Sequence, residues 1–207
     1  MQHLRTARDL DTALTFLAEQ DRLIAQAITE VGPPVLRKRR TGFAGLMSIL
    51  IGQQVSVAAA QSIENRLVAT MGKPTPEAFL VLSVEQCRAC GLSAQKQRYL
   101  SALAEALVSG QLRLSRLAQC DTEEVSAALQ AIPGIGPWTA DMYLMFIMRR
   151  ADIFAPGDLA LQEGYRRLAS VSQRPTPKDL GEIALRWMPF RSAAALVLWR
   201  YYTLGPK

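Results

Sequence analysis

The fold is decided by residues 129–141, which read Leu129-Gln130-Ala131-Ile132-Pro133-Gly134-Ile135-Gly136-Pro137-Trp138-Thr139-Ala140-Asp141. Proline lacks an N–H group and disfavours helix at the residue before it, so a helix that approaches Pro133 ends there. Pro137 suits the first turn of a new helix. Because glycine adopts backbone angles that side chains forbid, Gly134 and Gly136 predict a tight turn. The stretch therefore predicts two helices joined as a hairpin.

The turn of this hairpin is suited to binding a phosphate. Its glycines leave backbone N–H groups uncovered beside a helix N-terminus, where hydrogen bonds and the helix dipole both favour an anion. The Thr139 hydroxyl is a further candidate donor. Corners of this shape also occur as plain helix–turn–helix connections, so the motif alone leaves both interpretations open.

Helical signals fill the rest of the chain. Residues 121–124 and 83–86 carry capping-box patterns, and Thr75-Pro76 and Thr176-Pro177 mark further helix starts. Apolar periodicity predicts an amphipathic stretch and further helices at residues 8–31, 43–51, 55–71, 138–150, 158–170 and 190–202. Since no strand is predicted, we expect an all-α fold.

Composition limits the class of protein. The chain has 207 residues, enough for one domain or two small lobes, and 49% of them are apolar, which excludes a disordered tail. The net charge of +6 permits a polyanionic partner without proving one. We find no signal peptide and no apolar run of membrane length, so we expect a cytoplasmic protein that avoids membranes.

The cysteines and the histidine do not have the spacing of a four-ligand zinc site. The cysteines are Cys87, Cys90 and Cys120, and His3 is the only histidine. Cys87 and Cys90 are spaced like a redox or metal pair but have no second pair, so a four-ligand zinc site is not expected. We interpret the three as reduced structural cysteines.

Three further segments accompany the hairpin, in a fixed order. They are Ile51-Gly52-Gln53-Gln54-Val55-Ser56-Val57-Ala58, then Pro156-Gly157-Asp158, then Arg186-Trp187-Met188-Pro189-Phe190-Arg191-Ser192 followed by Trp199. Together with the hairpin they resemble the helix-hairpin-helix DNA glycosylase superfamily, and in particular its 3-methyladenine DNA glycosylase II branch. The resemblance runs from about Phe43 to about Tyr202.

The resemblance implies one glycosylase domain in two lobes with a cleft between them. The lobes would comprise about residues 42–150, and residues 1–41 with 151–207. Members of this branch often carry an extra N-terminal β-domain, so this chain looks like a compact form.

The resemblance makes Asp158 the catalytic residue. Breaking an N-glycosidic bond builds positive charge on the sugar, and a carboxylate beside it stabilises that charge and orients or deprotonates water. Asp158 also stands where a helix N-cap would, so a purely structural role is the alternative. Family members frequently have two aspartates here, whereas this chain has Gly157-Asp158. Asp141 and Asp152 are weaker alternatives.

The same resemblance places four residues around the extruded base. Trp138 and Trp199 match pocket-lining positions, Met142 falls where some relatives have an aromatic residue, and Tyr143 is a weaker candidate. A cationic alkylated purine is attracted to an electron-rich ring. Core packing is the alternative for each of these side chains.

DNA contacts are expected at several further positions. Gln54 matches the wedge that fills the space left by the base, although Gln53 and Gln54 could instead cap a helix kink. Arg191 and Ser192 could contact phosphate at a helix start, with a structural ion pair as the alternative for Arg191. The basic run Arg37–Arg40 is either a solvated connector or an arm that contacts phosphates.

The resemblance also bears on cofactors and reaction type. It implies a monovalent cation at the hairpin carbonyls near Ile132 and Ile135. The iron–sulfur cluster of some relatives needs four cysteines, and this chain has three, so we expect no such cluster. Bifunctional relatives carry a Schiff-base lysine where this chain has Trp138, which predicts a monofunctional enzyme.

We therefore expect a monomeric DNA repair glycosylase that removes alkylated bases, 3-methyladenine first, from double-stranded DNA, and that would be nucleoid-associated in a bacterium. The alternatives are a glycosylase for uracil, hypoxanthine or ethenoadenine, and a non-catalytic helix-hairpin-helix DNA-binding module.

Overall fold

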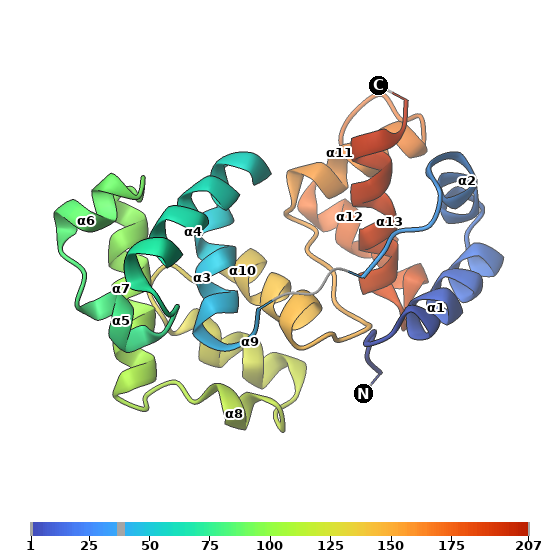
Figure 1. Ribbon diagram of the computed structural model, residues 1–207. Helices are drawn as coiled ribbons and strands as arrows, with labels where there is room; N and C mark the ends of the chain where they lie inside the picture. Colours follow the sequence, from blue (N-terminus) through green and yellow to red (C-terminus); the bar gives the residue numbers. More distant parts are fainter. Residues whose placement is uncertain (1, 37–39, 207) are drawn as a thin grey trace. The chain divides into compact units, whose positions relative to one another are not determined.

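The computed structural model describes residues 2–36 and 40–206. Within these residues the regular structure is helical, apart from one isolated antiparallel bridge between His3 and Arg150 (Figure 1). The predicted all-α class is confirmed. Three residues of the Arg37–Arg40 run lie outside the described part of the chain, and Arg40 is exposed.

The chain divides into two compact units. Unit 1 comprises Met1–Lys38 and Leu144–Lys207, and unit 2 comprises Arg39–Tyr143. Unit 2 is thus continuous in sequence, while unit 1 joins the beginning and the end of the chain. Leu4 N–H donates to Arg149 O at 2.7 Å and Ala151 N–H to Gln2 O at 3.0 Å, which fixes the N-terminal segment to the later one.

Unit 2 is built around two contacting helices, α3 (Gly42–Gly52) and α7 (Ala94–Val108). Both helices bury apolar side chains completely, among them Leu46 and Leu100, so the core of the unit lies along their contact. The remaining helices of the unit are α4 (Val57–Met71), α5 (Pro76–Leu80), α6 (Val84–Ala89), α8 (Leu114–Leu117), α9 (Thr122–Gln130) and α10 (Pro137–Met142).

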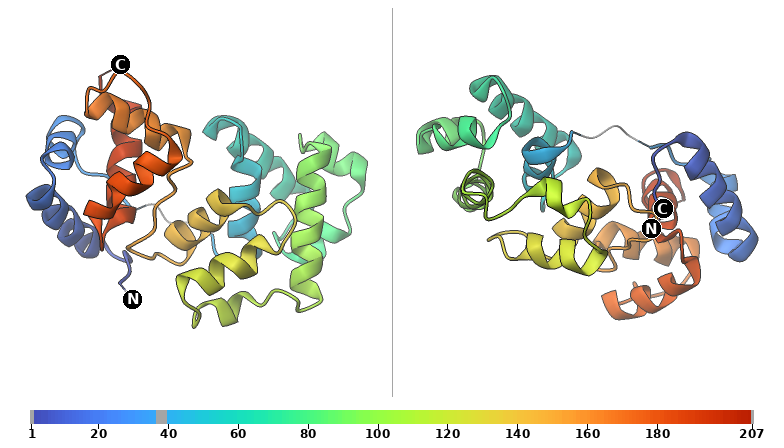
Figure 2. Two further views of the ribbon diagram at one scale, coloured as in Figure 1. Left: turned by 180° about the vertical axis from the view of Figure 1, so that it is seen from behind. Right: turned by 90° about the horizontal axis from the view of Figure 1, so that it is seen from below.

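Unit 1 is built around α13 (Arg191–Leu204), which packs on α11 (Leu159–Leu168), α1 (Ala7–Gln20) and α2 (Arg22–Val31) (Figures 1 and 2). The approach of α11 to α13 depends on Gly164, because a Cβ there would lie 2.6 Å from Leu198 O. The other short helices are α12 (Pro177–Ala184) and the 3₁₀ turn η2 (Leu185–Trp187). On α11, hydrogen bonds from Arg166 and Arg167 lower the pKa of Glu163 to about 2.

The amphipathic stretch predicted at residues 8–31 is two helices rather than one. Asp21 has extended backbone angles and accepts hydrogen bonds from Leu23 N–H and Ile24 N–H, so it begins α2. Its second oxygen accepts the Trp187 indole N–H at 2.7 Å and pairs with Arg186 at 2.8 Å. A buried carboxylate is costly without such partners, and here it links the first helices to η2.

The helix predicted for residues 138–150 is also broken. Regular α10 ends at Met142, a π-helical turn η1 spans Tyr143–Ile147, and Arg149 has a φ of 60°. The division between the units therefore falls after Tyr143, earlier than the predicted boundary at residue 150. Beyond this point, Phe146 stacks on Trp199 within unit 1.

The predicted helix starts are confirmed. Asp121 and Glu124 form a reciprocal capping box at α9, as do Ser83 and Gln86 at α6. Thr75 and Thr176 cap α5 and α12, each followed by a proline. No helix in the described part of the chain is long and apolar enough to cross a membrane.

Candidate functional site

The hairpin lies in unit 2, between α9 and α10. Gly134 has a φ of +89°, in the left-handed region that favours glycine. The ring of Tyr99, from α7, covers this residue so closely that a Cβ on Gly134 would lie 2.1 Å from the ring atom Cγ. Gly134 is thus required both by its backbone angle and by the packing of an aromatic ring.

Gly136 does not adopt the backbone angles that were predicted to require glycine. Its φ of −94° and ψ of −178° are extended angles that any residue adopts, so no unusual conformation requires glycine. A Cβ would meet nothing within 4 Å. Neither the backbone conformation nor local packing explains why residue 136 is glycine. Close approach of a ligand to the backbone would explain it.

Thr139 and Gln53 hold the turn from within the protein. The Gln53 side-chain amide donates to Gly134 O at 3.1 Å and to the Thr139 hydroxyl at 2.8 Å. Thr139 is 2% exposed and its hydroxyl accepts this bond inside the protein, so donation of the hydroxyl to DNA stays a prediction. Gln53 is half-buried, and its amide is used to fix the hairpin rather than to reach outward.

Gln54 is exposed in the α3–α4 loop, residues 53–56. Its φ of 54° is left-handed, an uncommon conformation for a residue with a long side chain. The Lys96 ammonium, from α7, donates to the carbonyl oxygens of Ile51 and Gln53 immediately before it. The loop therefore presents Gln54 outward on a backbone that other residues hold.

Asp158 lies in unit 1 as the N-cap of α11. Its Oδ1 accepts Ala160 N–H at 2.9 Å, Leu161 N–H at 3.0 Å and the Trp199 indole N–H at 3.1 Å. All three bonds converge on one carboxylate oxygen. The side chain is half-buried, and the positive end of the helix dipole favours a negative charge at this position.

Trp199 therefore contacts the candidate catalytic residue directly. Its ring also stacks on Phe146, with centroids 5.7 Å apart and an interplanar angle of 29°. Both rings are half-buried. The pocket position of Trp199 stays a prediction, and the structure adds a hydrogen bond from its indole N–H to the Asp158 carboxylate.

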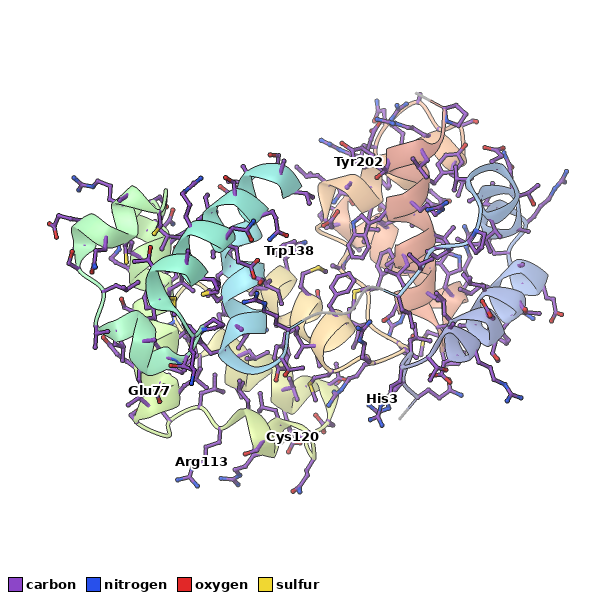
Figure 3. All side chains as sticks on the ribbon, in the orientation of Figure 1. His3, Glu77, Arg113, Cys120, Trp138 and Tyr202 are labelled. Atoms are coloured by element: carbon purple, nitrogen blue, oxygen red, sulfur yellow. The ribbon has the colours of Figure 1, made fainter. Side chains whose placement is uncertain are left out.

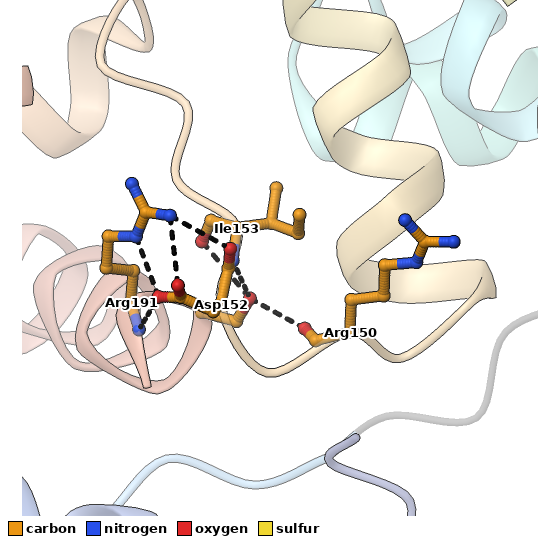
Figure 4. Close-up of polar contacts among 5 residues, drawn as sticks. Arg150, Asp152, Ile153 and Arg191 are labelled. Carbon is orange, nitrogen blue, oxygen red and sulfur yellow. Dashed lines mark hydrogen bonds and ion pairs between the residues drawn. The ribbon is translucent and has the colours of Figure 1, made fainter. Parts of the chain in front are cut away.

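Arg191 and Ser192, predicted to contact phosphate, are both engaged inside unit 1, and Figure 4 shows the contacts of Arg191. Arg191 forms a two-pronged ion pair with Asp152, Nε to Oδ1 at 2.7 Å and an Nη to Oδ2 at 3.0 Å. The Ser192 hydroxyl donates to Arg150 O and accepts Ile153 N–H, and the residue is 2% exposed. Ser192 is thus a structural residue, and the alternative interpretation of Arg191 as an ion-pair partner fits this geometry.

The predicted pocket residues of unit 2 differ in burial. Trp138, at the start of α10, is half-buried (Figure 3), whereas Met142 and Tyr143 are each 4% exposed. Side chains of the core are buried to the same degree, so the alternative interpretation, core packing, fits Met142 and Tyr143. Of this group in unit 2, Trp138 retains surface for a ligand.

The comparison with known proteins identifies the family. Residues 47–190 match the family described as HhH-GPD superfamily base excision DNA repair protein. The chain belongs to the HhH-GPD superfamily. DNA-3-methyladenine glycosylase 1 of Schizosaccharomyces pombe is 32% identical over 191 residues, which cover 90% of this chain and 84% of that protein. DNA-3-methyladenine glycosylase 2 of Escherichia coli is 29% identical over 75% of this chain and 55% of that protein.

A solved structure agrees with these relatives. The S. pombe 3-methyladenine DNA glycosylase in complex with abasic DNA is similar to this chain with a TM-score of 0.87 and 32% identity, covering 94% of this chain and 98% of that one. The HhH-GPD resemblance read from the four ordered segments is thus confirmed, together with its 3-methyladenine glycosylase branch.

Two of the three cysteines of this HhH-GPD protein are buried. Cys87 and Cys90 are buried around α6, and burial raises the pKa of the Cys87 thiol. Cys120 lies at the turn before α9 (Figure 3). Within the described residues, no group of three or more His, Cys, Asp or Glu side chains is arranged to hold a metal ion.

The predicted monovalent-cation site stays a prediction. Carbonyl oxygens are suitable ligands for such an ion, and the turn offers those of Ile132 and Ile135. Ile132 O already accepts Ile135 N–H at 3.1 Å, and the neighbouring Gly134 O accepts the Gln53 amide. The hairpin thus has internal bonds of its own at these atoms.

Sequence reasoning missed Lys96, Tyr99, Phe146 and Asp21. Lys96 and Tyr99 lie three residues apart in an ordinary amphipathic helix, so no local signal marks them. Phe146 belongs to an apolar run that is typical of core residues, so nothing in the sequence marks it as part of a site. Asp21 followed by Arg-Leu-Ile is a recognisable N-cap pattern, which the long amphipathic periodicity concealed.

Proposed function

We propose that this protein is a monofunctional DNA glycosylase that hydrolyses the N-glycosidic bond of alkylated bases, chiefly 3-methyladenine, and leaves an abasic site. The observation that carries the proposal is the Asp158 carboxylate, which three N–H donors hold through Oδ1 at the start of α11 in a chain of the HhH-GPD superfamily.

The enzyme must first take the base out of the duplex, at a cost of a few kcal/mol. In our proposal the backbone amides at Gly134 and Gly136 bind a phosphate of the damaged strand. The open space at Gly136 and the internal bracing of the turn support this role. Gln54 then enters the DNA duplex, where its side-chain amide can hydrogen-bond to the base left without a partner.

Asp158 acts on the extruded nucleotide. As the bond between C1′ and the base breaks, positive charge develops on the deoxyribose, and the carboxylate stabilises this charge electrostatically. It also orients the water that attacks C1′ and accepts a proton from it. A carboxylate that caps α11 through Oδ1 keeps its negative charge, so the structural role and the catalytic role do not exclude each other.

Aromatic rings account for the choice of base. An alkylated purine such as 3-methyladenine carries a positive charge that a normal base lacks. Stacking on an indole face favours such a cation by about 1–2 kcal/mol when water is excluded. Trp138 and Trp199 are the proposed rings, because both keep exposed surface. The charged base is also a good leaving group, so no strong general acid is needed.

The reaction stops at base removal. Cleavage of the backbone by a glycosylase requires an amine that forms a Schiff base with the sugar. The hairpin helix Pro137–Met142 contains no lysine, and Trp138 stands at the corresponding position. We therefore expect an abasic product with intact strands.

The experiment is to incubate the protein with methylated duplex DNA and identify the released bases by chromatography. Release of free 3-methyladenine, with strands cut only after alkaline treatment, is the expected result. Exclusive release of uracil would move the protein to another lesion, and release of no base from any damaged duplex would refute glycosylase activity.

The matched variant is Asp158→Asn. Asparagine can still accept N–H bonds through its side-chain oxygen and therefore cap α11, but it carries no charge. We expect base release to fall by at least about a thousandfold while binding to an abasic-site duplex persists. An Asp158→Asn protein with near wild-type release would exclude this carboxylate as the catalytic group.

A further inference from the structure

The α3–α4 loop has an unfavourable backbone conformation at its tip. Gln54 is exposed and has a φ of 54°, in the region that favours glycine. A residue with a long side chain persists there only where surrounding contacts fix the chain. The contacts that fix this loop therefore determine how Gln54 is presented.

Lys96 supplies two of those contacts from the first turn of α7. Its ammonium donates to Ile51 O and, at 2.9 Å, to Gln53 O. Both carbonyls belong to the end of α3, where carbonyl groups lack helical partners and the dipole is negative. The side chain is half-buried, and this burial lowers the pKa of Lys96.

The same helix supports the hairpin turn. Tyr99, about one turn after Lys96, packs its ring over Gly134. The Gln53 amide completes the connection by donating to Gly134 O at 3.1 Å and to the Thr139 hydroxyl at 2.8 Å. Helix α7 thus braces the loop and the turn together within unit 2.

We propose that Lys96 is a positioning residue for base extrusion, which fixes the α3–α4 loop so that Gln54 enters the duplex while the hairpin turn holds a phosphate. This inference rests on the proposed function, because it needs duplex DNA as the substrate. Lys96 contacts neither the base nor the sugar. Its loss therefore slows the opening of the duplex and leaves the cleavage of the glycosidic bond unchanged.

The test compares two duplexes that carry the same alkylated base, one with its normal partner and one with a mismatched partner. Extrusion costs less from a mismatch, so the wedge matters less there. In single-turnover assays we expect Lys96→Met to lower the rate of base release about tenfold to a hundredfold on the paired substrate. On the mismatched substrate we expect less than about a threefold loss.

Three controls sharpen the comparison. Lys73→Met removes the same charge from an exposed site of unit 2 and should behave as wild type on both duplexes. Lys96→Arg keeps the charge and its donors and should restore most of the paired-substrate rate. In a Gln54→Ala background, Lys96→Met should add no further loss.

An equal loss on both duplexes, or no loss on either, overturns the positioning role. If Lys96→Met does not fold, Lys96→Gln is measured in the same comparison, with the same duplex-selective loss expected. The two proposals fail differently: a wild type that releases no base refutes the function, whereas an active wild type with an unaffected Lys96→Met variant refutes only the role of Lys96.

Discussion

Two alanine substitutions in the hairpin turn should separate folding from DNA binding. Gly134→Ala places a side chain at a φ of +89° and a Cβ within 2.1–2.5 Å of ring atoms of Tyr99. Gly136→Ala places one at a φ of −94° with nothing within 4 Å. The two residues are neighbours in the same motif, yet the structure predicts opposite consequences.

The expected cost of Gly134→Ala follows from its two defects. A left-handed conformation costs an alanine about 1–2 kcal/mol. Displacing a packed aromatic ring costs about 1–3 kcal/mol more. Together these give a loss of about 2–5 kcal/mol, a large share of the roughly 5–15 kcal/mol that stabilises an ordinary domain. For Gly136→Ala we expect less than about 1 kcal/mol, since alanine is only a poorer N-cap than glycine.

The assays are urea unfolding followed by circular dichroism, and fluorescence anisotropy with a labelled abasic-site duplex. Gly136→Ala should keep an unfolding midpoint close to that of the wild type but bind the duplex at least about tenfold more weakly, because its methyl group occupies the space needed for the phosphate. A wild-type midpoint for Gly134→Ala would refute the packing argument. If Gly136→Ala bound the duplex with wild-type affinity, no phosphate would approach the backbone at residue 136.

Three further predictions concern unit 1. Asp21→Ala should lower the free energy of unfolding by about 2–4 kcal/mol in urea titrations, because it removes a helix cap and leaves the buried Trp187 N–H without its acceptor; a loss below 1 kcal/mol would contradict this. Trp199→Phe keeps an aromatic ring but removes the N–H bond to Asp158. Base release should therefore slow about tenfold while the affinity for abasic DNA is retained. Equal losses in base release and in affinity would argue against an orienting role for Trp199. Glu163 has a pKa lowered to about 2, so its stabilising effect is present at neutral pH and is lost as the pH falls through the range between its ordinary pKa and 2. Because this carboxylate is partly exposed, Glu163→Gln should cost at most about 1 kcal/mol at pH 7 and only a small part of that at pH 2. A cost as large at pH 2 as at pH 7 would refute the assignment.

Local rules predicted the elements of this fold well. Capping boxes such as Asp121–Glu124, and prolines at first helical positions, mark helix starts by chemistry that acts within four residues. The hairpin and the N-cap position of Asp158 were predictable for the same reason. The break at Asp21 was missed although its N-cap pattern is local, because the amphipathic periodicity continues across it. Its bonds to Trp187 and Arg186 join residues far apart in the chain, and no local pattern predicts them.

The candidate site shows the same division. The sequence indicated which residues carry chemistry, but it could not show which of their atoms the protein uses internally. Thr139 and Ser192 have hydroxyl groups that suit phosphate, yet both are 2% exposed and bonded within the fold. Lys96 was missed for the converse reason, because its partners are backbone carbonyls on another helix that no sequence pattern reveals.

In the sequence, unit 2 lies between the two segments of unit 1, and this order has a consequence for synthesis on the ribosome. Unit 2 has all of its residues once Tyr143 has emerged, whereas helices α1 and α2 must wait for α13. During that interval the apolar faces of the first two helices lack their main partner and are open to aggregation. We expect chaperone dependence during translation to be concentrated in the first thirty or so residues, and contacts between the chain ends to form last.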